Sequence, residues 1–280
     1  MNEPSSPLPP GTEIGRTALR VADRTAVVEF YREVVGLDPL RESDSRTVLG
    51  VDGEPLLVLT EGEDSSPRAS DTTGLFHNAV RVPTRAALGA ALRRVRERWR
   101  LDGASDHGVS EALYLTDPEG NGVEIYRDRP REEWPRTDDG GVEMGTYPLA
   151  LEDVAADDDG SDAAPPGTDI GHVHLEVSSL EAVDSFYTET LGFEVQAQMA
   201  DARFLGAGGY HHHIGANTWN RRTEPAEGLG IDYVEVVVPD GDAFDTLRDR
   251  LDSAQHSVTE TPEGISVRDP DGIEIRVRVT

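Results

Sequence analysis

The sequence predicts an α+β fold built from four βαβββ units in two paired halves. Three observations predict it. Four segments begin with a short strand of alternating apolar residues, each is followed by an amphipathic helical stretch, and two sequence phrases recur along the chain. The 280 residues are enough for two ordinary domains, each with a buried core.

The first unit begins with a strand over residues 14–21 (IGRTALRV), followed by a helix over about residues 25–35 that ends at Gly36. The second unit begins with a strand over residues 76–82 (FHNAVRV), and its helix covers about residues 85–99. Period-two alternation with β-branched residues predicts the strands, and apolar residues at 3.6-residue spacing predict the helices. Glycine directly after the first helix is a common helix end.

The third unit repeats the first, with a strand over residues 170–177 (IGHVHLEV) and a helix over residues 180–191 that ends at Gly192. The fourth has a strand over residues 231–238 (IDYVEVVV) and a helix over about residues 241–254. Units one and three share a phrase (VVEFYREVVGL and VDSFYTETLGF), and units two and four share another (TDPEGNGVEIY and RDPDGIEIRVR). Asp-Pro-acidic-Gly is a turn signature, which we expect between the third and fourth strands of a unit.

Composition divides the chain into four parts. Residues 1–12 form a polar, proline-rich N-terminal tail, and residues 13–150 form a first domain with two units. Residues 151–168 are acidic, carry Gly and Pro and show no periodicity, which is typical of a linker or an exposed loop. Residues 169–280 form a second domain with the other two units.

The formal net charge is −28, with 54 acidic against 26 basic residues, and every basic residue is Arg. A dense carboxylate surface repels nucleic acid and anionic membranes, and it is typical of proteins from halophiles. The N-terminus lacks the basic start and apolar stretch of a signal peptide, and no apolar run is long enough to span a membrane. We expect a cytoplasmic protein that binds neither nucleic acid nor membrane.

The double βαβββ plan, with its FYxxxLGF and DPxGxxxEI phrases, resembles the vicinal oxygen chelate superfamily. That family includes glyoxalase I, the extradiol dioxygenases and the bleomycin-resistance proteins. The resemblance covers nearly the whole chain outside the N-terminal tail and the linker, and it implies half-open β-barrels around a metal. Because this fold hosts isomerases, dioxygenases and metal-free binders, the fold alone does not decide the function.

The family's metal ligands lie near the start of a unit's first strand and on its fourth strand, shortly after the DPxG turn. At these places units two and three carry His77, Glu124 and His172. Two His and one carboxylate form the ligand set of non-heme Fe(II) oxygenases, which keep open coordination positions. The chain has no cysteine to offer as a ligand. His174 lies on the same strand face as His172 and stays an alternative ligand, although the repeat alignment favours His172.

Units one and four carry Arg16, Asp232 and Arg276 at the corresponding places. Guanidinium groups cannot ligate a cation, so we expect no metal in the half-open barrel formed by units one and four. The predicted site then takes its ligands from units two and three, which lie on opposite sides of the linker. In the best-known extradiol enzymes the single-ligand unit precedes the two-ligand unit, so the order here is different, and the site requires units two and three to pair across the linker.

Two further stretches resemble the extradiol dioxygenases. One is GASDHGVSEALYLTDPEGNGVEIY (residues 103–126), which contains His107 and Tyr114, and the other is GGYHHHIGANTW (residues 208–219). Together they look like the catechol-2,3-dioxygenase branch found in bacilli and their relatives. The resemblance implies that Tyr114 hydrogen-bonds a substrate atom or an oxygen-derived atom.

The paired-His strand of those enzymes supplies a catalytic acid/base residue. The alignment suggests His212 for this role, with His107 as its partner. Strand alternation places His212 on one face and His211 and His213 on the other, and a slip of one residue would exchange them. His256 lies in a polar loop, where we expect it to be solvated.

The resemblance implies an Fe(II)-dependent extradiol dioxygenase that cleaves a catechol-type aromatic diol with O2. Mn(II), Ni(II) and Zn(II) are the alternative metals. Two other functions stay open: a glyoxalase-like metal-dependent isomerase or lyase, and a non-catalytic small-molecule binding protein of the same fold. The isomerases usually supply four protein ligands, whereas only three fit here. The expected partners are the small aromatic diol and O2, and a homo-oligomer is left open.

Overall fold

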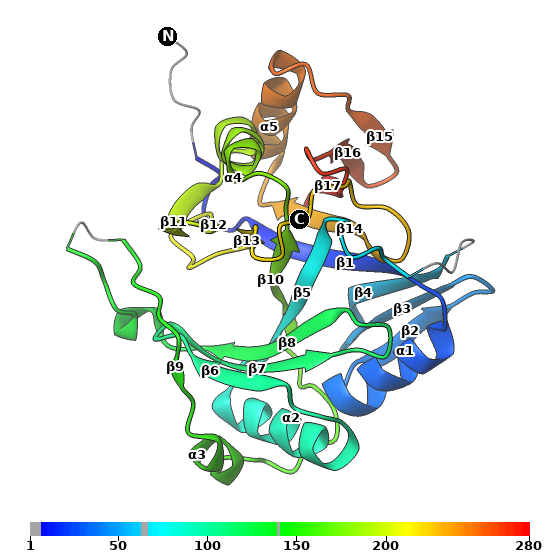
Figure 1. The fold of residues 1–280 in the computed structure, drawn as a ribbon, viewed down its shortest axis with the longest axis vertical. Coiled ribbons are helices and arrows are strands. Elements are labelled where there is room, and N and C mark those ends of the chain that lie inside the picture. Colours follow the sequence, from blue (N-terminus) through cyan, green and yellow to red (C-terminus); the bar gives the residue numbers. More distant parts are fainter. Residues whose placement is uncertain (1–6, 63–66, 139–140) are drawn as a thin grey trace.

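The computed structural model describes residues 7–62, 67–138 and 141–280. They form two curled sheets with helices at the periphery (Figure 1). One sheet has eight strands in the order β15-β16-β17-β14-β1-β4-β3-β2, and the other has nine in the order β11-β12-β13-β10-β5-β8-β7-β6-β9. The predicted α+β fold of four βαβββ units in paired halves is confirmed.

Units one and four form the eight-stranded sheet. Unit one contributes β1 (Glu13–Val21), β2 (Asp38–Glu42), β3 (Arg46–Val51) and β4 (Glu54–Glu61). Unit four contributes β14 (Gly230–Val238), β15 (Thr259–Thr261), β16 (Gly264–Arg268) and β17 (Glu274–Val279). The two units join where β1 pairs with β14 in the antiparallel direction.

Units two and three form the nine-stranded sheet. Unit two contributes β5 (Gly74–Arg81), β6 (Gly103–Asp106), β7 (Ser110–Thr116) and β8 (Gly122–Asp128), and β9 (Tyr147–Pro148) adds to its edge. Unit three contributes β10 (Asp169–Glu176), β11 (Glu194–Met199), β12 (Ala202–Gly206) and β13 (Ile214–Asn217). Antiparallel pairing of β5 with β10 joins the units across the acidic segment, which is the arrangement that the predicted metal site requires.

The helices at the four predicted places begin and end close to the predicted residues, and two short helices lie where none is predicted. The helices are α1 (Arg24–Phe30), α2 (Arg85–Arg98), α3 (Leu151–Ala156), α4 (Leu180–Val183) and α5 (Gly241–Ser253), with a short 3-10 helix at Arg131–Glu133. Helices α1 and α4 each continue as a π-helical stretch, over Tyr31–Val35 and Asp184–Leu191. These stretches end at Gly36 and Gly192, whose φ angles of 93° and 94° lie in the left-handed region that favours glycine.

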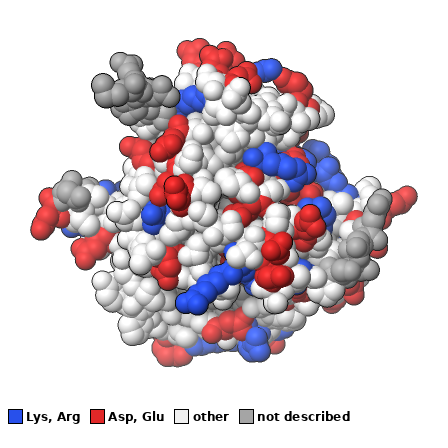
Figure 2. Space-filling model, turned by 45° about the horizontal axis from the view of Figure 1, so that its top comes forward, with Lys and Arg blue, Asp and Glu red and all other residues white. Residues whose placement is uncertain are grey.

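The surface is strongly acidic. On the face shown in Figure 2, acidic side chains lie on many parts of the surface, with basic side chains grouped among them. In the described part of the chain, no helix is both long and apolar enough to cross a membrane.

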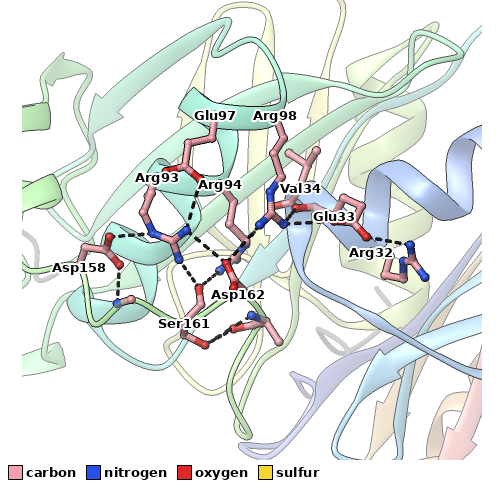
Figure 3. Close-up of polar contacts among 12 residues, drawn as sticks. Arg32, Glu33, Val34, Arg93, Arg94, Glu97, Arg98, Asp158, Ser161 and Asp162 are labelled. Carbon is pink, nitrogen blue, oxygen red and sulfur yellow. Dashed lines mark hydrogen bonds and ion pairs between the residues drawn. The ribbon is translucent and has the colours of Figure 1, made fainter.

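The acidic segment between the two halves is more ordered than its composition predicts. Its first six residues form α3, with Val154 buried against α2. The loop that follows is held by arginines of α2 (Figure 3). Arg93 pairs with Asp158 at 3.0 Å and with Asp162 at 3.2 Å, so opposite charges anchor a segment that lacks an apolar period.

Arg94 ties three parts of the chain together. Its side chain is only 1% exposed, and it donates hydrogen bonds to the carbonyl oxygens of Val34 (3.2 Å), Val35 (2.9 Å) and Ser161 (3.0 Å). The first two are carbonyls at the end of the π-helical stretch, where backbone acceptors lack helical partners. Burial lowers the pKa of Arg94 to about 10, so the guanidinium stays charged at neutral pH.

We expect Arg94→Met to lower the free energy of unfolding by about 3–5 kcal/mol, because it leaves buried carbonyls without donors. Guanidinium chloride unfolding followed by circular dichroism measures this loss. Arg96→Met is the matched control on the same helix. Arg96 is 40% exposed and pairs with the exposed Glu152, so its loss is expected to cost less than about 1 kcal/mol. Equal losses in the two variants would contradict the role assigned to Arg94.

Candidate metal centre and its cavity

Three buried side chains converge in the nine-stranded sheet. The Nε2 atoms of His77 and His172 lie 3.0 and 3.2 Å from Oε2 of Glu124, and 3.4 Å from each other. Two ligands about 2.1 Å from one ion, at right angles about it, lie about 3.0 Å apart. The three atoms are therefore spaced as neighbouring ligands of a single ion would be. Among the described residues, this is the one group of three or more acidic, His or Cys residues close enough to hold a metal.

The convergence follows from the strand pairing. His77 lies on β5, which pairs with parallel β8 on one side and antiparallel β10 on the other. Glu124 of β8 and His172 of β10 both pair with Ala79, two residues after His77 and on the same face of β5. The small side chain of Ala79 leaves space for the three ligand atoms to approach one another.

The protonation states suit a cation. Burial opposes ionisation of Glu124, but the imidazoles of His172 and His77 hold the pKa of this carboxyl well below its usual value. Burial lowers the pKa of His172 to about 4, although Glu124 acts in the opposite direction. At neutral pH the site thus offers an ionised carboxylate and a neutral imidazole, the forms in which these groups ligate metals.

A cavity of about 390 Å³ lies beside this triad. That volume is within the range of small-molecule sites, which are commonly apolar with a few polar groups. Besides the triad, the lining combines apolar and polar side chains, among them Phe76, Val109, Tyr114, Met144, His107, His174, Met199, Phe204, His212 and Trp219. Met199 and Trp219 are also exposed to solvent. The site can therefore hold a small, largely apolar molecule next to a metal.

His107 and Tyr114 form one polar pair in the cavity. Nδ1 of His107 lies 2.7 Å from the carbonyl oxygen of Gly145, and its Nε2 lies 2.7 Å from the Tyr114 hydroxyl. A carbonyl can only accept, so Nδ1 carries the proton, and the neutral ring accepts from Tyr114 at Nε2. The Tyr114 oxygen then presents its lone pairs to the cavity. His107 is therefore the partner of Tyr114 in this structure.

His212 lines the cavity and is linked through His211 to the partly buried carboxylate of Asp128. Its Nδ1 lies 2.8 Å from Nδ1 of His211, whose Nε2 lies 2.9 Å from Oδ1 of Asp128. His211 donates to the carboxylate through Nε2, so its Nδ1 accepts from His212. The Nε2 of His212 is then unprotonated, and it makes no hydrogen bond with the described residues. Burial lowers the pKa of His212 well below its ordinary value, which keeps this nitrogen available as a base.

The other histidines have different surroundings. Nδ1 of His213 accepts a hydrogen bond from the Ala207 amide at 3.2 Å, and His213 is absent from the cavity lining. His174 lines the cavity, and its buried Nε2 has no partner among the described residues. His256 packs edge-on against Phe186, with ring centroids 5.2 Å apart.

The pattern of residues 211–213 suggests a strand, but the segment is not part of one. Strand β13 begins only at Ile214. The two residues Gly208 and Gly209, with φ angles of 58° and 70°, turn the chain after β12. The histidines therefore follow a turn, and their orientations are set by hydrogen bonds instead of strand alternation.

Several residues of this site are not identified by any sequence pattern. Phe76, Phe204 and Trp219 surround the ring of His174, with centroids 5.2, 5.8 and 5.3 Å away. Asp128 lies four residues after Glu124 in the chain and forms a hydrogen bond with His211. In the sequence it looks like any acidic residue at the end of a strand. The one available signal was Trp219 within the paired-His phrase.

One expectation about the eight-stranded sheet is wrong. The repeat alignment predicts Asp232 at the place of His77, but the strand pairing puts Tyr233 there. His77 pairs with His174 of β10, and Tyr233 pairs with Ala18, the corresponding residue of β1. The irregularities next to these pairs fall at the same places in both sheets, so Asp232 corresponds to Phe76. An alignment that begins unit two at Phe76 and unit four at Ile231 is therefore displaced by one residue.

Two sequence comparisons give the same family. The sequence model of the Glyoxalase/Bleomycin resistance protein/Dioxygenase superfamily matches residues 13–125 and 169–277. Catechol-2,3-dioxygenase of Bacillus subtilis (strain 168) is 40% identical over 269 residues, which cover 92% of this chain and 94% of that protein.

Solved structures share the fold at low sequence identity. Glyoxalase I from Zea mays has a TM-score of 0.58 at 16% identity, with 95% of this chain and 92% of that chain covered. The cppA protein from Streptococcus pneumoniae has a TM-score of 0.59 at 14% identity, with 96% and 99% covered. The family match, the 40% identical relative and the paired βαβββ units confirm the resemblance: this chain belongs to the glyoxalase/bleomycin resistance protein/dioxygenase superfamily.

Proposed function

We propose that this protein is an Fe(II)-dependent extradiol dioxygenase, which cleaves the ring of a catechol-type aromatic diol with O2. The observation that carries the proposal is the triad of His77, Glu124 and His172 beside an apolar cavity. The 40% identity to a catechol-2,3-dioxygenase over most of both chains supports the same activity. Two imidazoles and one carboxylate are the ligand set of oxygenases that keep positions open for substrate and gas.

The chain's own groups suit this reaction. Bound to the triad, Fe(II) would supply adjacent positions for both diol oxygens and for O2, and a redox centre between them. His212 can take a proton from a diol hydroxyl at its unprotonated Nε2. The imidazolium formed would be stabilised through His211 by the Asp128 carboxylate. The lone pairs of Tyr114 can accept a hydrogen bond from a hydroxyl of the bound diol.

The cavity favours an aromatic substrate. Phe76, Phe204 and Trp219 present ring surfaces in the lining, and aromatic groups prefer edge-to-face or offset contacts with such rings. The ring of His174 adds to this lining, and its buried Nε2 has no partner among the described residues. A flat ring carrying two adjacent hydroxyls suits this combination of apolar walls and few polar groups.

The main alternative is a glyoxalase-like isomerase, because the fold is shared with glyoxalase I. A fourth protein ligand would favour it. His174 is the nearest candidate, yet it falls outside the group of ligand atoms that lie within 4.8 Å of one another. The three-residue set therefore favours the dioxygenase.

Anaerobic loading with Fe(II), followed by O2 uptake with a panel of catechols, tests the proposal. We expect one O2 consumed per diol and a ring-opened product heavier by two oxygen atoms. The same protein loaded with Zn(II) is the control, and it is expected to consume no O2, because Zn has no redox chemistry. Turnover of a substrate by the Zn(II) form without O2 uptake would point to the isomerase.

A further inference from the structure

The eight-stranded sheet surrounds a second cavity, of about 430 Å³. Its lining contains five arginines and three glutamates, a surplus of positive charge in a chain whose formal net charge is −28. The arginines are Arg16, Arg41, Arg46, Arg276 and Arg278. A concave site with a surplus of one sign of charge attracts ligands of the opposite sign.

The internal repeat shows which positions of the nine-stranded sheet correspond to two of these arginines. In the strand pairing, the places of His77, His172 and Glu124 are taken by Tyr233, Arg16 and Arg276. The small Ala79 of the nine-stranded sheet corresponds to Glu235, which pairs with Arg16 at 2.6 Å. Fixed guanidinium cations thus occupy positions that carry candidate ligands for a cation in the other sheet.

Part of the positive charge is available to a ligand. Arg16 and Arg278 are held by Glu235, and Arg16 also contacts Glu263. Arg41 and Arg46 are exposed, and their guanidinium groups make no ion pair or hydrogen bond with the described residues. Their donors are therefore met by solvent alone and are free to bind a ligand.

Arg276 gives the cavity a flat wall. Its guanidinium carbon lies 3.6 Å from the centroid of the Tyr233 ring, so the two planar groups are in contact. Only its Nε is engaged by a carboxylate, that of Glu274 at 2.7 Å. A guanidinium held in this way presents its remaining donors in a fixed fork, which matches a carboxylate in bidentate geometry.

Much of the remaining lining is apolar, with Ser43 and Thr261 as its polar members. Val48, Pro55 and Val277 line the cavity together with the ring of Tyr233. Inorganic anions gain nothing from such surfaces, whereas the body of an organic acid would bury apolar area against them. We propose that this second cavity binds a small planar organic carboxylate. Its charged end would lie on Arg276, Arg46 and Arg41, and its flat body against the apolar part of the lining.

Calorimetric titration of the full-length, metal-loaded protein with benzoate tests this site. Benzamide serves as the uncharged analogue of the same shape, and inorganic phosphate as the anion without an apolar body. We expect benzoate to bind measurably and more tightly than either. Arg276→Gln, and the double variant Arg41→Gln with Arg46→Gln, are each expected to weaken benzoate by about tenfold to hundredfold, because a charge-assisted contact is lost.

Arg20→Gln is the matched control, because Arg20 lies on β1, as Arg16 does, but is absent from the cavity lining. Its benzoate affinity is expected to stay within about twofold of wild type, the scale of an exposed charge. Absence of benzoate binding, or benzamide or phosphate binding as tightly, would overturn the proposal. An unchanged benzoate affinity in the cavity variants would also overturn it, since benzoate would then occupy the cavity beside the metal triad. None of these readouts depends on ring cleavage.

Discussion

Replacing Glu124 with Gln is expected to abolish metal binding and, with it, turnover. The exchange removes the only negative charge of the triad but keeps the size of the side chain. Even changes around the ligands of a metal lower affinity by about 10- to 100-fold, so loss of a charged ligand should exceed that range. Metal content after dialysis and O2 uptake with a catechol, measured on the same preparation, check the prediction.

Glu274→Gln is the matched control for this variant. Glu274 lies on β17, the strand that corresponds to β8, and its partner is Arg276. We expect it to keep the wild-type metal content. Circular dichroism shows whether either variant is unfolded. A folded Glu124→Gln protein that retains stoichiometric metal and full activity would contradict the assignment of the triad.

Replacing His212 with Asn is expected to lower kcat by about 10²–10⁴-fold while metal content stays near wild type. Asn keeps a donor near the position of Nδ1, which can still reach His211, but it has no counterpart of the basic Nε2. The variant therefore separates a lost proton acceptor from a lost ligand. Metal content must be measured beside kcat, because loss of the metal would lower the rate for a different reason.

The same role predicts the acid limb of the pH profile. Burial, with the neighbouring imidazoles acting in the same direction, lowers the pKa of His212 below 6.5. The base form therefore persists as pH falls through neutrality, and the limb due to His212 should lie below pH 6.5. This limb should be absent from the residual activity of His212→Asn.

His211 and His213 provide the comparison. His213→Asn keeps an acceptor for the Ala207 amide and lies outside the cavity lining, so its kcat should stay within about a few-fold of wild type. His211→Asn should give an intermediate loss, because the link from His212 to Asp128 is broken. Full activity in His212→Asn, together with a large loss in His213→Asn, would show that the other face of this segment carries the chemistry.

Much of the fold could be predicted from local patterns. The alternation in IGRTALRV and IGHVHLEV predicted β1 and β10 to within about a residue at each end. Gly36 and Gly192 marked the helix ends because a positive φ is unfavourable for other residues. These properties depend on a few neighbours in the chain, which is why periodicity and turn residues reveal them.

The acidic segment shows where local patterns are insufficient. Residues 151–168 have the composition of a linker, yet α3 forms there and Arg93 and Arg94 hold the loop beyond it. Those arginines lie 65 and 67 residues before their partners in the chain, on a helix whose own pattern gives no sign of this contact. Only the packed structure brings the charges together.

The sequence by itself determined the family, the four units and the candidate ligands His77, Glu124 and His172. Each of these depends on residue types at repeated positions. The tertiary structure decided which units pair, which residue of unit four takes the place of His77, and how His212 connects to Asp128. The physical reason is strand register. Which residues stand opposite each other depends on hydrogen bonds to a strand far away in the sequence, and a difference of one residue changes every pair.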